Sequence, residues 1–289
     1  MQSPDTPQCI WLIDASIYVF RPWYAWSNTH KNEAGQCINA ALGFIDFVDD
    51  LLANEKPIHI GFAFDESLIS SHRKDILPNY KANRKSASEN LRFQFTLCRR
   101  YIRALGITEA SSPYYEGDDV LATWARHYQR EHNAQIVKVI TGDKDLVQLV
   151  GESDLWCDYS KQISLDYKGV IKKFGVRPDQ VADQLALAGD KSDNIPGVPG
   201  IGMAVAAKLL RHFDNIETML NSIERIGKMK FLGAMKVQLL VEEYQQQIKQ
   251  CRRVTSLITD VPDIEMDISR KLVNKDEVEQ LFIELGKTV

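Results

Sequence analysis

The sequence predicts an α/β fold in which a central, mainly parallel sheet is flanked by helices and followed by a helical region. Two observations support this prediction. Short apolar runs that end near an acidic residue alternate with segments whose apolar residues recur at helical spacing. Strand signals then thin out after about residue 165, while helical patterns continue. With 289 residues, 44% of them apolar, the chain is able to bury a sizeable core.

The individual elements follow from local patterns. Short apolar runs predict buried strands at 9–13, 58–64 and 136–140. Helical spacing in the first half predicts helices at 38–52, 91–105 and 118–128, and a helix opening at 145–150. In the second half it predicts helices at 170–174, 180–188, 204–213, 216–223 and 237–254. No linker rich in Gly, Ser or Pro divides the halves, so we expect an α/β domain at 1–160 packed against a helical region at 161–289.

Composition excludes several classes of protein. The five cysteines are odd in number, widely spaced and without a C-x-x-C pair, which argues against a disulfide framework or zinc site and predicts a reducing compartment. The N-terminus shows no secretory signal, and no apolar run reaches the roughly 18 residues of a membrane span. We therefore expect a cytoplasmic protein with no membrane partner. The net charge of −4 is weak evidence against a nucleic-acid partner, because nine clustered acids alone contribute −9.

The most informative feature is a set of nine carboxylates in five short motifs. They are Asp14, Asp65, Glu116, Asp118, Asp119, Asp143, Asp145, Asp190 and Asp193. Asp14, Asp65 and Asp143 each follow a predicted strand, and sites in α/β sheets lie beyond the carboxyl ends of the strands. A helix N-cap is the common alternative for one such Asp, but it does not account for the whole set. We expect the acids to share one cleft.

Such a crowd of acids needs positive charge nearby, because close like charges repel or take up protons. Hard divalent cations such as Mg²⁺ and Mn²⁺ prefer carboxylate oxygens. Nine acids exceed the needs of one ion, so we expect two or more ions, an arrangement that is common where phosphodiesters are hydrolysed. Helix caps and surface acids are the alternative interpretation.

A strongly basic stretch predicts a surface that faces phosphates. Nine Arg or Lys residues lie between Arg73 and Arg103, against only two acids. A solvated helix face is the alternative. Inside the stretch, Tyr80 lies next to Lys81 and is followed by Arg84 and Lys85. An aromatic ring among cations is suited to stacking on an unpaired base while the cations hold phosphates.

Two further segments are candidates for contact with DNA. Arg21 precedes the aromatic run 22–26, for which core packing and DNA contact both stay open. The segment 194–202 has two Pro and three Gly residues before a predicted helix, so a phosphate backbone is able to approach the helix N-terminus. Lys208 lies further along that helix. A merely structural turn is the alternative, but Asp190 and Asp193 directly precede this segment.

The five acidic motifs, residues 80–84 and residues 193–200 together resemble the 5′-nuclease family of flap endonucleases. The likeness is strongest to the 5′–3′ exonuclease domain of bacterial DNA polymerase I and its stand-alone relatives, over roughly residues 9–260. It implies a PIN-like nuclease domain, a helical arch near 70–105 and a helix–hairpin–helix at 195–212. No polymerase region follows residue 289, so we expect a free-standing nuclease.

The resemblance also implies roles for individual residues. It places Asp14, Asp65, Glu116, Asp118 and Asp119 at a first metal site, and Asp143, Asp145, Asp190 and Asp193 at a second. Lys81 and Arg84 would steer the scissile phosphate, so the predicted catalytic residues are Lys81, Arg84, Asp118 and Asp143. The helix–hairpin–helix would hold the duplex, and in some relatives its carbonyls bind K⁺. The predicted DNA contacts are Arg21, Arg73, Tyr80, Lys81, Arg84, Lys85, Gly197, Gly200, Gly202 and Lys208.

One departure from the family pattern is Lys191, which stands where a small polar residue is usual. A lysine beside Asp190 would lower the pKa of that carboxyl or compete weakly with a metal ion.

The expected activity is that of a structure-selective 5′ nuclease, dependent on Mg²⁺ or Mn²⁺, that leaves a 5′-phosphate and a 3′-hydroxyl. We expect a bacterial, nucleoid-associated monomer whose partner is DNA with a 5′ end, flap or junction. Because metal ions activate water, no Ser, Cys or His nucleophile is needed. Two alternatives stay open. One is a PIN-type ribonuclease, and the other is a non-catalytic DNA-junction binding module whose acids hold a structural ion.

Overall fold

The fold was obtained as a computed structural model, which describes residues 9–26, 30–66, 71–131, 136–286. Its centre is a six-stranded sheet in the order β3-β2-β1-β4-β5-β6. Strands β1 (Cys9–Asp14), β2 (His59–Ala63) and β4 (Ile136–Ile140) were predicted from sequence, and they form the middle of the sheet. Strands β3 (Thr108–Ala110) and β5 (Leu155–Asp158) extend it in parallel, and β6 (Ile163–Leu165) closes it antiparallel to β5. The predicted mainly parallel sheet is confirmed.

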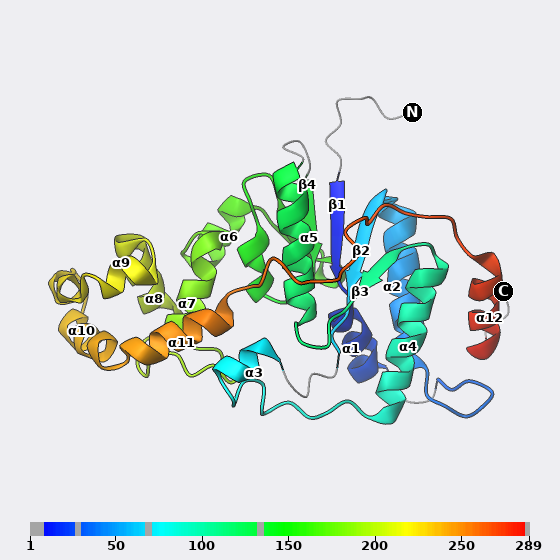
Figure 1. The fold of residues 1–289 in the computed structure, drawn as a ribbon, viewed down its shortest axis with the longest axis horizontal. Helices are drawn as coiled ribbons and strands as arrows, with labels where there is room; N and C mark the ends of the chain where they lie inside the picture. Colours follow the sequence, from blue (N-terminus) through cyan, green and yellow to red (C-terminus); the bar gives the residue numbers. More distant parts are fainter. Residues whose placement is uncertain (1–8, 27–29, 67–70, 132–135, 287–289) are drawn as a thin grey trace.

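Helices cover both faces of the sheet, as Figure 1 shows. Successive strand residues point to opposite faces, so β1 sends Ile10 and Leu12 into one core and Trp11 and Ile13 into another. The first core packs against α5 (Gly117–Glu131) and the second against α1 (Ala15–Ala25), α2 (Asn39–Glu55) and α4 (Glu89–Ala104). Buried on both faces, the central strands consist of apolar runs rather than alternating polar and apolar residues.

The helical region extends from one end of the sheet (Figure 1). It contains α6 (Tyr167–Phe174), α7 (Val181–Ala188), α8 (Met203–Phe213), α9 (Ile216–Leu220), α10 (Ala234–Glu243) and α11 (Gln245–Thr255). Its apolar side chains continue the core beneath α5, because Leu185, Leu209 and Val241 belong to the same buried cluster as Val120 and Trp124. The helix predicted at 237–254 is interrupted at Tyr244, and the one predicted at 145–150 is the 3₁₀ turn η1 (Asp145–Leu149).

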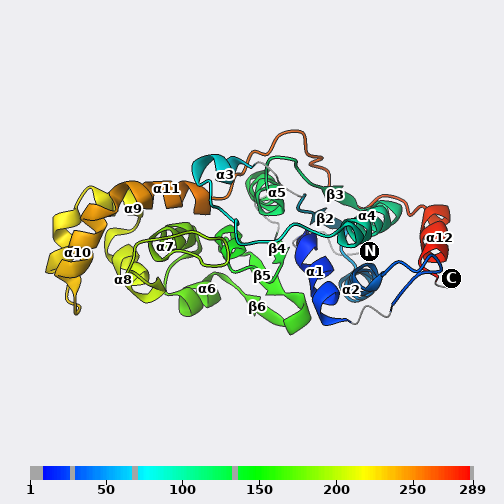
Figure 2. The same cartoon turned by 90° about the horizontal axis from the view of Figure 1, so that it is seen from below.

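The segment predicted as a helical arch connects the helical region with the helices that cover the sheet. The short helix α3 (His72–Ile76) contacts α11, whereas α4 packs against α2. Between α3 and α4, residues 77–88 form turns and contain no helix. Figure 2, which views the molecule from below, shows this segment crossing the C-terminal side of the sheet. We call residues 77–88 the strap.

Residues after α11 return along the sheet to α12 (Lys275–Glu284), which packs against α4. Arg100 on α4 pairs with Glu277 at 3.0 Å and with Glu284 at 2.7 Å. None of the helices in the described ranges is long and apolar enough to cross a membrane.

The helix–hairpin–helix was expected at 195–212, but that range contains only part of the hairpin and α8; the helix before the hairpin is α7, at Val181–Ala188. Asp190 and Ile195 exchange backbone hydrogen bonds of 2.9 and 2.8 Å across the hairpin. Gly197 has φ +57°, and a Cβ at this position would lie 2.2 Å from the backbone nitrogen of Gly189. Only glycine fits there without moving backbone atoms. The hairpin therefore depends on Gly197 for its shape.

Substitution of Gly197 by Ala should destabilise the folded protein by about 2 kcal/mol or more, because it combines a strained φ with a backbone clash. Gly202→Ser is the matched control, because Gly202 has φ −95° at the N-cap of α8 and an added Cβ would meet no heavy atom within 4 Å. Urea unfolding measures both variants. A similar loss of stability in the two variants would contradict this account of the hairpin.

Candidate active site

The three strand-end acids lie together at the C-terminal edge of the sheet. Asp14 closes β1, and its carboxylate accepts a hydrogen bond from the hydroxyl of Thr141 at 2.7 Å. Asp65 lies just beyond β2 and accepts one from the N–H of Gly117 at 2.8 Å. Burial, followed by the charge of Asp65 and then that of Asp143, raises the pKa of Asp14 to about 7. The strand ends thus bring these carboxylates close enough to repel one another.

Helix α5 adds a further carboxylate from its first turn. Burial is the largest cause that raises the pKa of Asp118 well above its ordinary value, and the charges of Asp143, Asp14 and Asp65 follow. Four acids from four separate parts of the fold, at or just beyond the ends of β1, β2 and β4 and in the first turn of α5, therefore act on one another electrostatically. A cation between them would favour the ionised forms of Asp14 and Asp118.

A second group of acids joins the first through Asp143. Burial, followed by the charges of Asp143 and Asp190, raises the pKa of Asp145 to about 8. The Oδ1 atom of Asp145 is buried and has no hydrogen-bond partner among the described residues. Asp193 also acts on Asp143, whose pKa is raised first by burial. The two predicted metal groups are thus adjacent, with Asp143 between them.

The strap brings two cations to this cluster. The ammonium of Lys81 lies 2.8 Å from Glu116 and 3.6 Å from Asp193, and a guanidinium nitrogen of Arg84 lies 2.5 Å from Asp193. Burial alone would raise the pKa of Glu116, but Lys81 and Arg73 outweigh it and lower the pKa below its ordinary value. Glu116 is therefore ionised and paired, unlike Asp118 two residues later.

Lys144 is the counter-ion of Asp190, a role that sequence reasoning did not assign. Its ammonium lies 2.8 Å from the carboxylate, whose other oxygen accepts bonds from the N–H and hydroxyl of Ser192 at 2.7 and 2.6 Å. Burial would raise the pKa of Asp190, but Lys144 and Ser192 lower it. The lower pKa was expected from Lys191, which is exposed. Lys144 stands between Asp143 and Asp145 in the sequence, and that position was the available signal.

Asp119 and Arg73 have structural roles, which corrects two expectations. Asp119 was expected to bind metal, but its side chain is fully buried and makes two bonds to Arg73, of 2.5 and 2.7 Å. The same carboxylate accepts bonds from the N–H groups of Ile258 at 2.9 Å and Glu116 at 3.2 Å. Arg73 was expected to contact DNA, but it is only 3% exposed. This buried ion pair ties α3 to α5 and leaves neither side chain available to a ligand.

Tyr80 also differs from its expected role as a stacking platform for a base. Its ring is buried at 3% exposure, and its hydroxyl lies 3.0 Å from Glu116 and 3.1 Å from Asp193. The hydroxyl donates to these carboxylates, so Tyr80 anchors the strap to both acid groups. A buried ring offers no face to a nucleobase.

Of the other predicted DNA contacts, Gly197 is buried in the hairpin, and the remaining residues lie on the surface or near it. Lys85 on the strap and Lys208 on α8 are exposed, as are Gly200 and Gly202 in the hairpin. Arg21 is partly buried, pairs with Asp158 at 2.9 Å and lies 4.8 Å above the ring of Tyr18.

The donor set of this edge fits hard divalent cations. Among the described residues, no three Asp, Glu, His or Cys side chains are arranged as a ready coordination shell. The fit instead rests on the type and charge of the donors, because several carboxylates have pKa values raised by one another and Asp145 has an unpartnered oxygen. Rotation of these side chains around an ion would relieve both conditions.

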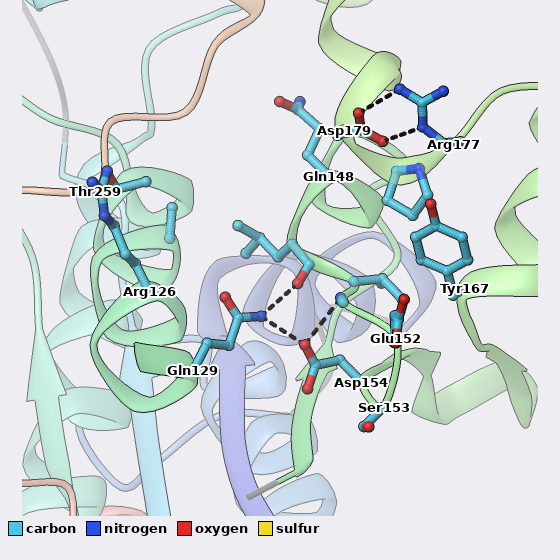
Figure 3. A pocket seen from close by; sticks show the side chains of 15 residues that line it. Arg126, Gln129, Gln148, Glu152, Ser153, Asp154, Tyr167, Arg177, Asp179 and Thr259 are labelled. Carbon is cyan, nitrogen blue, oxygen red and sulfur yellow. Dashed lines mark hydrogen bonds and ion pairs between the residues drawn. The ribbon is translucent and has the colours of Figure 1, made fainter. Parts of the chain in front are cut away.

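A separate groove of about 900 Å³ lies between α5 and the turn at 177–179 (Figure 3). Its two arginines already have partners. Arg177 pairs with Asp179 at 2.9 Å, and Arg126 donates to the hydroxyl of Thr259. None of the nine acids lines this groove.

Two adjoining family models match nearly the whole chain. Residues 9–175 match the N-terminal resolvase-like domain of 5′-3′ exonucleases, and residues 176–279 match the C-terminal SAM fold of the same family. The chain belongs to the 5′–3′ exonuclease family. The resemblance inferred from the acidic motifs and the hairpin is thereby confirmed.

The curated relatives of this exonuclease-family chain include several DNA polymerases I. The enzyme of Bacillus caldotenax is 34% identical over 283 residues, which are 95% of this chain and 31% of that protein. The enzyme of Mycobacterium tuberculosis is 33% identical over 281 residues, which are 95% and 30%. The chain thus spans about a third of the length of these relatives.

Solved structures share the fold at lower identity. T5 5′-exonuclease with bound zinc has a TM-score of 0.70 at 17% identity, covering 96% of this chain and 100% of that one. The catalytic core of Rad2 in complex with a DNA substrate has a TM-score of 0.63 at 14% identity, covering 99% of this chain and 90% of that one.

Neighbouring acids on α5 should respond to substitution in opposite ways. Asp119→Asn should lower the free energy of unfolding by about 3–5 kcal/mol, because it removes the charge that makes two short bonds to the buried Arg73 and leaves only Glu116, 3.6 Å away, as a charged partner. Asp118→Asn should raise it by about 0.5–2 kcal/mol in the presence of EDTA, because it removes a carboxylate that burial and its neighbours disfavour. Chemical unfolding at pH 8 measures both. The same sign for the two variants would contradict this division of roles.

Stability without metal should fall as pH rises from about 5 to 8. The pKa values of Asp14 and Asp145 are about 7 and 8 in the folded protein, against about 3.9 in the unfolded chain. The folded state therefore holds protons that the unfolded state has lost, and their stabilising effect disappears as pH passes the folded values. Unfolding in EDTA across this range should show a shallower slope for Asp145→Asn. Saturating Mg²⁺ should stabilise the wild type more at pH 8 than at pH 5.

Proposed function

We propose that this chain is a divalent-metal-dependent 5′ nuclease that hydrolyses DNA phosphodiesters near a 5′ end or at a 5′-flap junction. The products would be a 5′-phosphate and a 3′-hydroxyl. One observation carries the proposal. Carboxylates whose pKa values are raised by burial and then by one another gather at one sheet edge, directly beside the cations of the strap. Family membership supports the reaction class, and the relatives' own names attach it to DNA.

Two groups of residues would hold the ions. Asp14, Asp65, Asp118 and Asp143 would hold one, and Asp145, Asp190 and Asp193 would hold the other with Asp143 between them. Divalent ions in such a pair supply an activated water and stabilise the leaving oxygen of an in-line displacement. Glu116 is paired with Lys81 and would act from outside the first group.

Lys81 and Arg84 would position the scissile phosphate. Both are already charged at neutral pH, because Glu116 and Asp193 outweigh the effect of burial and raise the pKa of Lys81 above its ordinary value. Their present partners are the acids that a metal ion would neutralise instead. An arriving phosphate would then take over the lysine and arginine as charge-assisted donors. Because the strap carries both residues, the substrate and the acid cluster would share the same cations.

The hairpin and α8 would hold the duplex by its phosphate backbone. Gly200 and Gly202 are exposed, no side chain caps α8, and free N–H groups at a helix start suit a phosphate. Lys208 would add a charge further along the helix. We also propose a K⁺ ion bound by carbonyl oxygens of this hairpin, in line with the resemblance described above. The protein would act as a monomer in the bacterial cytoplasm, close to the nucleoid.

Substitution of Asp143 by Asn should reduce cleavage of a labelled 5′-flap DNA in Mg²⁺ by about 10³-fold or more, because it removes the acid that both groups share. Binding of the same DNA in Ca²⁺ should persist. Asp263→Asn is the matched control, since Asp263 is an exposed acid outside both groups, and it should cleave like the wild type. Full activity of Asp143→Asn would refute the assignment. A wild type that binds flaps but never cleaves them would indicate a binding module.

A further inference from the structure

The far end of the helical region carries an exposed surface that the proposed function does not use. It consists of the turn 229–233 between η4 (Ile223–Lys228) and α10, together with the outer face of α10. Leu232 is 104% exposed, Met235 59% and Leu239 57%. We call this surface the tip. Figure 1 shows α10 at the end of the molecule opposite α12.

The tip is basic as well as apolar. Between Arg225 and Val241 the chain has four Arg or Lys residues and no Asp or Glu, although exposed Glu224 precedes this segment and exposed Glu242 and Glu243 end α10. Lys228, Lys230 and Lys236 are all exposed. The lysines lie at the turn and on the first turn of α10, beside Leu232 and ahead of the two acids that end the helix. Exposed leucine with lysines on both sides is complementary to a polyanion that has an apolar interior.

The turn is held in a fixed shape. The N–H of Gly227 donates to the side chain of Gln238 at 3.0 Å, and the N–H of Val237 donates to the carbonyl of Gly233 at 3.0 Å. Gly233 has φ +86°, a left-handed conformation that favours glycine, and the side chain of Leu232 just before it is fully exposed. A rigid, protruding leucine has the shape of a wedge, whereas a docking site for a peptide would be a groove.

The tip is continuous with the hairpin and α8. The ammonium of Lys208 lies 5.6 Å from the ring centre of Phe231 in the turn, and a Cβ on Gly200 would lie 3.5 Å from Leu240 on α10. Lys208 is five residues beyond Met203 and hence roughly 8 Å along the helix axis. A duplex turn is about 34 Å long. The tip therefore lies within one duplex turn of the start of α8, close enough for a single duplex to contact both.

We propose that the tip is a second contact with duplex DNA, in which Leu232, supported by Met235, enters the minor groove and wedges against a base step while Lys230 and its neighbours hold phosphates. This inference rests on the proposed function, since it concerns the same substrate. Proteins that wedge apolar side chains into the minor groove unstack a step and kink the duplex. The tip would thus bend the duplex and fix its distance from the acid cluster.

The test compares Leu232→Ala with Leu272→Ala, which removes an equally exposed leucine (96%) near the other end of the molecule. Anisotropy in Ca²⁺ measures binding to a series of 5′ flaps whose duplex increases in length. Leu232→Ala should bind long duplexes about 5–10-fold more weakly with an unchanged salt slope, and should match the wild type on duplexes too short to reach the tip. Lys230→Ala should lower the salt slope by about one. Leu272→Ala should behave as the wild type throughout.

A spectroscopic measurement tests the wedge itself. With 2-aminopurine placed at successive duplex steps, the wild type should increase the emission at one step, and Leu232→Ala should not. Equal DNA affinity and equal emission for the two leucine variants would overturn the inference. It would also be overturned if Leu232→Ala bound DNA like the wild type but no longer bound phosphatidylserine vesicles or no longer self-associated. Because Leu232 is fully exposed, its variant should unfold like the wild type. Cleavage by the wild type in Mg²⁺ is measured separately. Absence of cleavage would count against the proposed nuclease function, whereas unchanged DNA binding by Leu232→Ala would count against the proposed contact at the tip.

Discussion

The structure depends on how the chain tolerates many carboxylates at one edge of its sheet. Parallel strands direct Asp14 and Asp143 to that edge, and α5 adds Asp118. Burial and mutual repulsion raise the pKa values of these acids. Lys81, Arg84 and Lys144 offset part of the negative charge, but they pair with Glu116, Asp190 and Asp193 and leave the central acids without a cation. The edge thus contains two kinds of acid: those paired with a lysine or arginine of the protein, and those that have no such partner.

This division links the folding of the strap to the proposed chemistry. The strap is anchored by Tyr80, whose hydroxyl contacts Glu116 and Asp193, and by the backbone bond of 2.9 Å from Lys81 to the carbonyl of Asp193. The same contacts place two cations where a phosphate would arrive. The acids at the edge would therefore have two roles, since some would bind the proposed ions and others order the basic strap that would face the substrate.

Much of this arrangement was predictable from the sequence, and the remainder depended on distant contacts. The apolar runs predicted β1, β2 and β4 because each is long enough to form a distinct pattern, whereas β3, β5 and β6 have only three or four residues and gain stability by pairing with neighbours. Asp118 and Asp119 look equivalent in sequence, but consecutive helical residues point in different directions. Only the fold shows that Arg73, 46 residues earlier, meets Asp119. The burial of Tyr80 likewise depends on segments that are distant in the sequence, and so does the ion pair between Lys144 and Asp190.

The central claim is that the unneutralised acids form a cradle for divalent cations. The most direct test is anomalous scattering from a crystal of the protein soaked in Mn²⁺. The account predicts two peaks, one among Asp14, Asp118 and Asp143 and the other among Asp145, Asp190 and Asp193, with the side chain of Asp119 still bound to Arg73. Saturating Mn²⁺ that produces no peak at this edge, while the fold is intact, would contradict the account.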